Sequence, residues 1–169
     1  MIVIAALCSA CASTGAVPRP FPTPGSTGST GSGGSPAAPN ARLAKPAFDG
    51  YALVGTALAL RGAPYRNGGA DPKGFDCSGF TQYVFAQYGV ALPREVREQF
   101  KQGKQIDANN LAPGDLIFFS TTDPGPSHVG IAVGGDEFVH APSSTGVVRV
   151  EHLGSSYWAP RYLGARRVN

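Results

Sequence analysis

The sequence predicts an α+β fold in which N-terminal helices pack on a small antiparallel sheet. Residues 47–102 show apolar residues at helical spacing together with helix start and stop signals. Residues 116–168 instead contain short runs rich in β-branched and aromatic residues, separated by turn residues. Because the helical segments precede the strands and do not alternate with them, the helices are expected on one face of the sheet.

Three helices are expected. The first lies within residues 47–62, where apolar side chains recur at helical spacing and a glycine provides the stop. The second has Asp76 as its N-cap and runs to about residue 88, since a glycine follows at that point. The third is short and covers residues 93–102, because Pro93 suits the first helical position.

Five strands are expected after the helices. They cover residues 116–120, 128–133, 137–141, 147–150 and 162–168. The Gly134-Gly135-Asp136 segment is a hairpin signal. A three-residue loop there would place His128 and His140 on one sheet face as diagonal neighbours, whereas a two-residue loop would send them to opposite faces. Gly130 and Ala132 share the face of His128 and leave room for a helix to approach.

The composition divides the chain into three parts. Only 15% of the 169 residues are charged, and the chain contains 23 Gly and 15 Pro. Residues 1–12 resemble the end of a secretory signal, and residues 13–46 form a Gly/Ser/Pro/Thr-rich linker that is expected to be disordered. Residues 47–169 form the globular domain. Ser9-Ala10-Cys11 resembles a bacterial lipoprotein cleavage site, so Cys11 is the expected lipidation site; the alternative is an ordinary signal peptide cut nearby.

Charge and cysteine usage narrow the class of function. The net charge is +3, and no stripe of Lys and Arg stands out, which argues against a nucleic-acid partner. A mild positive charge suits a polymer that carries carboxylates. Cys77 is the single cysteine of the globular part, so neither a disulfide framework nor a metal-binding cysteine pair is expected there.

Cys77 is the best candidate for a nucleophile. It follows Asp76 at the expected first turn of a helix, where the N–H groups and the macrodipole favour a thiolate and lower the thiol pKa. His128 and His140 lie in strand contexts, and an imidazole can take the thiol proton while a third polar group orients it. Two alternatives are a buried structural thiol and a zinc site made by Cys77, His128 and His140. The chain lacks the closely spaced ligand pair typical of zinc, and no cofactor is expected.

Four segments carry a family resemblance, in order and with ordinary spacing. They are Asp76-Cys77-Ser78-Gly79-Phe80, Pro113-Gly114-Asp115-Leu116-Ile117-Phe118-Phe119, His128-Val129-Gly130-Ile131 and Phe138-Val139-His140-Ala141. Together they resemble the NlpC-type family of bacterial cell-wall cysteine peptidases, and the match runs from about residue 47 to the C-terminus. The resemblance implies a papain-like fold and an enzyme that cuts the peptide stems of peptidoglycan.

The resemblance also implies roles for individual residues. Cys77 would be the nucleophile, His128 the general base and His140 the polar third member. Tyr65 would contribute to the oxyanion site, together with the backbone N–H of Cys77.

Substrate contacts are implied for two further residues. Asp76 and Ser78 resemble family positions that contact the stem peptide. The Leu92-Pro93-Arg94 segment also resembles the family, but Glu95 stands where a small hydroxyl residue is common, which leaves the surroundings of Arg94 open.

The resulting hypothesis is a monomeric peptidoglycan endopeptidase that is exported to the periplasm or cell envelope and anchored to a membrane by lipid. The resemblance allows two bonds, γ-D-glutamyl to diamino acid within a stem or D-alanyl to diamino acid in a cross-link. A cell-wall amidase or a transferase with the same chemistry is the second hypothesis. A catalytically silent wall-binding lipoprotein is the third, although the presence of Cys77, His128 and His140 argues against it.

Overall fold

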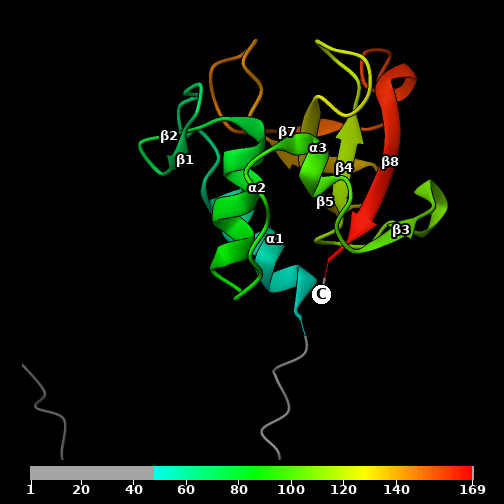
Figure 1. Ribbon diagram of the computed structural model, residues 1–169, viewed down its shortest axis with the longest axis horizontal. Helices are drawn as coiled ribbons and strands as arrows, with labels where there is room; N and C mark the ends of the chain where they lie inside the picture. Colours follow the sequence, from blue (N-terminus) through cyan, green and yellow to red (C-terminus); the bar gives the residue numbers. More distant parts are fainter. Residues whose placement is uncertain (1–47, 169) are drawn as a thin grey trace, which may run out of the picture. The chain divides into compact units, whose positions relative to one another are not determined.

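The computed structural model describes residues 48–168. Two helices, α1 (Gly50–Ala59) and α2 (Cys77–Ala86), lie against one face of a six-stranded sheet (Figure 1). No helix in this part of the chain is long and apolar enough to cross a membrane. The expected signal segment, the expected linker and Cys11 lie outside the described residues.

The sheet is antiparallel throughout, with the strand order β3-β8-β4-β5-β6-β7. Its strands are β3 (Lys104–Ile106), β4 (Leu116–Phe119), β5 (His128–Gly134), β6 (Glu137–His140), β7 (Arg149–His152) and β8 (Tyr162–Arg167). A separate two-stranded hairpin precedes α2, and short helical turns complete the chain. These elements are β1 (Ala70–Asp71), β2 (Gly74–Phe75), α3 (Val96–Gln99), η1 (Ala108–Asn110) and η2 (Ala159–Arg161).

Apolar side chains fill both faces of the sheet. The larger cluster joins α1 and α2 to the face that carries Val129, Ile131 and Val139. The smaller cluster covers the opposite face and includes Phe138 and Trp158. The predicted α+β arrangement, with helices on one face of an antiparallel sheet, is therefore confirmed.

The first predicted helix is present as α1, but the residues that it buries are not those whose apolar spacing predicted it. Asp49 caps α1 by accepting hydrogen bonds from the backbone N–H groups of Tyr51 and Ala52, at 3.0 and 3.2 Å. Leu53 and Ala57 are buried against the sheet, whereas Tyr51 is 77% exposed. The apolar spacing thus predicted the helix correctly, but it also included residues of the exposed side.

The second helix begins as the sequence predicts. The Asp76 side chain accepts a hydrogen bond from the N–H of Gly79 at 2.7 Å, and this cap fixes Cys77 as the first helical residue. Phe80 and Val84 are fully buried on the face toward the sheet. The regular helix ends at Ala86, slightly before the predicted end.

The third helix is much shorter than predicted, because α3 starts at Val96 and not at Pro93. Side chains of α2 and of α3 itself bind the carbonyl groups that a longer helix would use. Gln82 donates to the carbonyl of Leu92 at 2.9 Å, and Gln99 donates to the carbonyl of Pro93 at 2.8 Å. These contacts hold the segment before α3 outside the helix, and Glu95, the N-cap of α3, has an extended backbone conformation.

The β5–β6 hairpin has an unexpected geometry. Gly134 pairs with Glu137, so the loop contains two residues, yet Ile131 pairs with Val139 because an extra residue bulges at Val133. The bulge restores the register that a three-residue loop would give, so His128 and His140 share one face, which is the first of the two outcomes considered. The helices nevertheless cover the other face, so the expected approach of a helix to Gly130 is wrong.

Two further differences concern strands. The predicted strand at residues 147–150 is displaced, since β7 pairs with β6 through Arg149–His152. The sequence analysis also missed β3 and the β1–β2 hairpin. These strands have only two or three residues each, too few for an alternating pattern to be visible.

Gly79 allows the loop before α2 to pack closely on the helix. A Cβ atom added at Gly79 would lie 2.0 Å from the carbonyl oxygen of Gly69. The Gly79→Ala variant is therefore expected to lower the free energy of unfolding by about 1–3 kcal/mol, measured by urea denaturation. Gly55→Ala is the matched control, because a Cβ there meets nothing within 4 Å and should stabilise α1 by up to about 1 kcal/mol. Equal changes in both variants would contradict the close packing.

Candidate active site

The Cys77 thiol lies where the start of α2 meets the start of β5. The sulfur is surrounded by the backbone N–H groups of Val129, Ser78 and Cys77 itself, each of which favours the thiolate. Val129 directly follows His128 at the beginning of β5. The fold thus brings the thiol at the helix N-terminus next to the strand that carries the first of the two predicted histidines.

The pKa of this thiol is raised, not lowered. Burial is the largest cause, the Asp76 carboxylate adds to it, and together they raise the pKa of Cys77 to about 11 in spite of the three N–H groups. The expectation of a lowered pKa from the helix N-terminus alone is therefore wrong for the free protein. At neutral pH Cys77 is a neutral thiol that needs a base to become a nucleophile.

His128 and His140 form a directly bonded pair. His128 Nε2 and His140 Nδ1 are 2.7 Å apart, and the two rings are nearly perpendicular at 87°. His140 is completely buried and His128 is 8% exposed. Since His128 uses Nε2 for this contact, Nδ1 is the ring nitrogen that remains free to meet a thiol proton.

Trp158 covers the pair from one side. Its ring stacks on His128 with centroids 5.3 Å apart, and it meets the ring of His140 edge-on at 5.0 Å. The indole Nε1 donates a hydrogen bond to Glu151 Oε2. This cover excludes water from the histidines and holds the rings in place.

Both histidines are neutral at physiological pH. Burial lowers the pKa of His128 to about 4. Burial, followed by the neighbouring His128 and Arg149, lowers the pKa of His140 to about 2. A neutral imidazole can accept a proton, so the protonation state of His128 suits a general base.

These lowered pKa values predict that stability falls in acid. Below pH 6.5 the unfolded chain protonates both histidines while the native chain does not, so lowering the pH favours unfolding. Between pH 6.5 and 5 each histidine should cost about 2 kcal/mol of unfolding free energy. Urea denaturation across this range should show that His140→Asn removes about half of the dependence.

The exposed His152 provides the control for this experiment, because its side chain is 64% exposed. His152→Gln should leave the pH dependence of the wild-type protein unchanged. An equal slope in His140→Asn and His152→Gln would show that the buried pair does not control acid stability.

Tyr65 lies in electrostatic contact with the thiol. Burial raises the pKa of its phenol, and the charges of Cys77 and Asp76 raise it further, whereas Arg94 lowers it. The backbone N–H of Tyr65 donates to the carbonyl of Gly146 at 2.7 Å, which ties this segment to the loop before β7. The phenol therefore remains a neutral hydrogen-bond donor beside Cys77.

Asp76 and Ser78 are held in a polar cluster with Arg94. The Arg94 guanidinium forms an ion pair with Asp76 Oδ2 and donates to Ser78 Oγ at 2.7 Å. Asp76 also accepts from the N–H of Gly68 at 3.0 Å. Asp76 and Ser78 are 9% and 5% exposed, so Arg94 is the exposed member of the cluster. Glu95 does not disturb these contacts of Arg94.

Three residues around the site were not assigned a functional role from the sequence; they are Gln99, Glu151 and Trp158. Gln99 is fully buried and bonds Thr81 Oγ1 at 2.8 Å and the carbonyl of Ser78 at 3.1 Å, which fixes α3 against the start of α2. Glu151 and Trp158 lie behind the histidine pair. Glu151 directly follows the strand predicted at residues 147–150, so the sequence assigned it to no sheet face.

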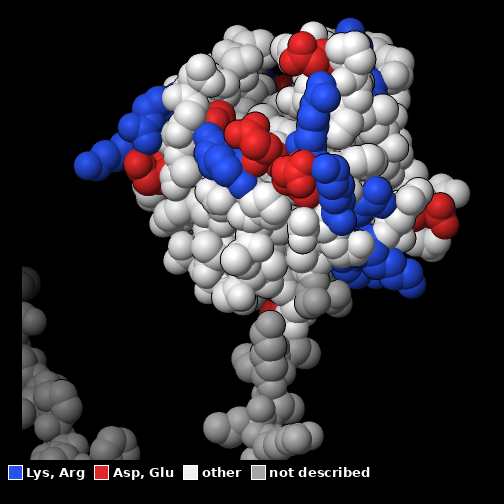
Figure 2. Space-filling view, in the orientation of Figure 1, with Lys and Arg blue, Asp and Glu red and all other residues white. Residues whose placement is uncertain are grey.

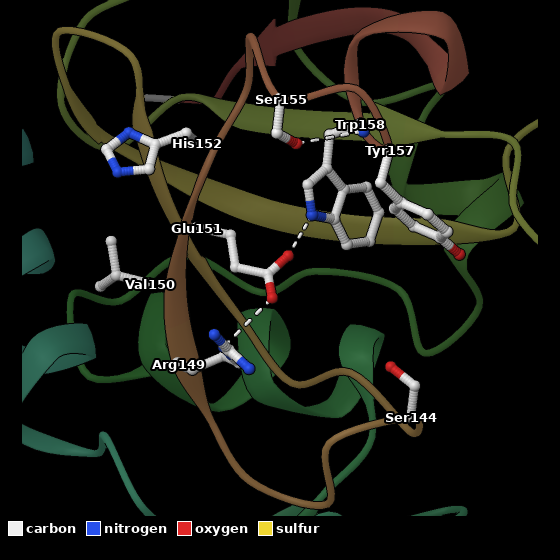
Figure 3. Close-up of a pocket in the computed structure, with 8 residues that line it drawn as sticks. All are labelled: Ser144, Arg149, Val150, Glu151, His152, Ser155, Tyr157 and Trp158. Carbon is white, nitrogen blue, oxygen red and sulfur yellow. Dashed lines mark hydrogen bonds and ion pairs between the residues drawn. The ribbon is translucent and has the colours of Figure 1, made fainter.

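A cavity of about 550 Å³ lies beside Glu151 and Trp158. Arg149, Glu151, Tyr157 and Trp158 contribute to its wall (Figure 3). The face seen in Figure 2 carries acidic and basic side chains close together. Within residues 48–168, no group of three or more His, Cys, Asp or Glu side chains is arranged to hold a metal ion.

The site combines a thiol at a helix N-terminus, at the start of the strand that carries His128, with a buried histidine pair. On a papain-like α+β fold this combination defines a candidate thiol hydrolase site. The NlpC/P60 family model matches residues 62–167. The chain therefore belongs to the NlpC/P60 family, as the sequence motifs indicated.

Relatives and solved structures agree with this assignment. The chain is 46% identical over 109 residues to the murein DD-endopeptidase MepS/murein LD-carboxypeptidase of Escherichia coli, covering 64% of this chain and 57% of that protein. It is 39% identical over 132 residues to the gamma-DL-glutamyl hydrolase of Bacillus subtilis, covering 76% of this chain and 32% of that protein. The chain thus spans about a third to about half of these relatives. The crystal structure of an NlpC/P60 family protein from Bacillus cereus superposes with a TM-score of 0.68 and 33% identity, covering 72% of this chain and 41% of that structure.

Proposed function

We propose that the chain is a peptidoglycan endopeptidase that uses Cys77 as its nucleophile. The observation that carries the proposal is the contact of the Cys77 thiol with the backbone N–H of Val129, the residue after His128, together with the His128–His140 pair, whose nitrogen atoms are 2.7 Å apart. This set contains a nucleophile, a neutral base and a group that orients the base. The relative named as a murein DD-endopeptidase supports the choice of substrate.

The geometry allows a two-step reaction. His128 takes the thiol proton as the sulfur attacks the scissile carbonyl carbon, and the negative charge that develops on the carbonyl oxygen is met by the Cys77 N–H and the Tyr65 phenol. His128 then gives the proton to the departing amine, and a thioester remains on Cys77. Water, deprotonated by His128, attacks the thioester and releases the carboxylic acid and the thiol.

A substrate-binding role for the polar cluster of Asp76, Ser78 and Arg94 belongs to the same proposal, as does export of the protein. Arg94, fixed by Asp76 and Ser78, offers a partly exposed guanidinium to a carboxylate of the stem peptide.

The named relatives act on murein and on γ-DL-glutamyl bonds, which supports an exported protein that acts in the cell envelope. Lipidation of Cys11 stays a prediction from the sequence.

Mass analysis of the fragments released from purified peptidoglycan tests the proposal, with the full chain and its Cys77→Ala variant compared. We expect fragments with the wild-type chain only. A new γ-D-glutamyl carboxyl terminus would identify the bond within the stem, and a new D-alanyl terminus would identify the cross-link. Release by both proteins would contradict the thiol mechanism, and release by neither would contradict the hydrolase.

A further inference from the structure

Glu151 directs a carboxylate oxygen toward the buried side of His140. In the β6–β7 pairing Arg149 lies opposite His140 and Glu151 lies opposite Phe138, so all of these side chains share the face of the histidine pair. His140 Nε2 is fully buried and has no hydrogen-bond partner among the described residues. Glu151 Oε2 lies 3.6 Å from this nitrogen.

Two donors hold the Glu151 carboxylate in this position. Trp158 Nε1 donates to Oε2, and the Arg149 guanidinium lies 3.1 Å from Oε1 (Figure 3). The carboxylate lies between the two side chains and cannot turn away without losing one of them. An ionised carboxylate only accepts hydrogen bonds, so the nitrogen that faces it is favoured in its protonated form.

The position of one proton on His140 determines the protonation of His128. A neutral imidazole carries one donor nitrogen and one acceptor nitrogen. If His140 is protonated on Nε2, its Nδ1 is an acceptor, and the 2.7 Å contact must be donated by His128 Nε2. The neutral His128 then has an unprotonated Nδ1, which is the form that can accept the thiol proton.

The opposite tautomer would disable the base. With the proton on Nδ1, His140 would direct the Nε2 lone pair at the Glu151 carboxylate, which is repulsive. His128 would then accept at Nε2 and carry its proton on Nδ1, so it could not take a proton from Cys77. The Glu151 carboxylate faces His140, and His140 in turn contacts His128. The carboxylate therefore selects the arrangement of protons in which His128 is a base.

We propose that Glu151 is a positioning residue that sets the tautomers of both histidines by holding the proton of His140 on Nε2. This inference rests on the proposed function, because it assigns Glu151 a part in the activation of Cys77 by His128. Glu151 acts through His140, whose Nε2 it faces at 3.6 Å. Trp158 contributes to the same positioning, because its indole N–H donates to the Glu151 carboxylate and holds it toward His140.

The tautomers can be read directly by NMR of the full chain labelled with ¹⁵N in its imidazoles, at neutral pH. We expect His140 and His128 to be protonated on Nε2 in the wild-type protein. In Glu151→Leu, His140 should lose this preference and populate the Nδ1-protonated form, and peptidoglycan cleavage should fall by about 10- to 100-fold. The tautomer measurement needs no activity, so it stays informative even if the proposed function fails.

Two further variants separate the tautomer effect from loss of structure. Glu137→Ala is the matched control, because this exposed glutamate lies on β6 and its neighbour in the sheet is His152; it should change neither tautomer nor cleavage. The double variant Glu151→Leu/Trp158→Phe removes the indole donor together with its acceptor, and it should keep the altered tautomer of His140. Wild-type tautomers in Glu151→Leu, or their return in the double variant, would overturn the proposal.

Discussion

Replacing His128 by glutamine is expected to lower kcat/KM for peptidoglycan cleavage by about 10²- to 10⁴-fold. Glutamine can still bond to His140, but it cannot take a proton from a thiol. Since burial and Asp76 raise the pKa of Cys77 to about 11, almost no thiolate forms at neutral pH without this base. Initial rates on purified peptidoglycan or a soluble stem peptide provide the measurement.

A comparison of the Cys77→Ala variant with the double variant Cys77→Ala/His128→Gln tests whether the two residues act as one unit. Residues that act as one unit have effects that do not add, so the double variant should be no less active than Cys77→Ala alone. If the two losses instead multiplied, His128 would support activity in a way that does not require Cys77. Circular dichroism of all variants controls for folding, and His152→Gln, at an exposed position, should retain full activity.

The parts of the fold that local chemistry determines could be predicted from the sequence. The N-cap at Asp76 places Cys77 at the start of α2, because a cap and the helix after it involve neighbouring residues only. The strands that carry His128 and His140 were likewise visible as apolar runs flanking a glycine-rich turn. Motif recognition then led to the correct family.

Features that depend on pairing across the fold could not be predicted. The β5–β6 register depends on a bulge at Val133, for which no local signal exists. The position of Glu151 beside His140 follows from the pairing of β6 with β7. The high pKa of the Cys77 thiol has the same origin, because the elements that bury it come from distant parts of the chain.

The start of α3 shows how side chains can override a local preference. Pro93 is suited to the first position of a helix, and the sequence analysis placed the helix there. Gln82 and Gln99 bind the carbonyls of Leu92 and Pro93, so this segment stays outside the helix and Arg94 can reach Asp76. The polar cluster beside the thiol therefore depends on the shortening of this helix.

Replacing Asp76 by alanine is expected to cause a large loss of stability, about 2–4 kcal/mol of unfolding free energy. The side chain of Asp76 is only 12% exposed. It caps α2, accepts from Gly68 and neutralises Arg94. Its removal leaves the guanidinium and two backbone N–H groups without their acceptor. Urea denaturation at pH 7 provides the measurement.

Two variants distinguish the cap from the ion pair. Asp76→Asn retains an oxygen for the N–H of Gly79 but loses the charge that faces Arg94, so its loss of stability should be intermediate. Asp71→Ala is the matched control, because Asp71 and Arg66 form an exposed pair, with side chains 50% and 51% exposed, and the change should cost less than about 1 kcal/mol. If Asp76→Ala cost no more than Asp71→Ala, the polar cluster would not stabilise the fold. The role of Asp76 would then be confined to its contacts with Arg94 and substrate.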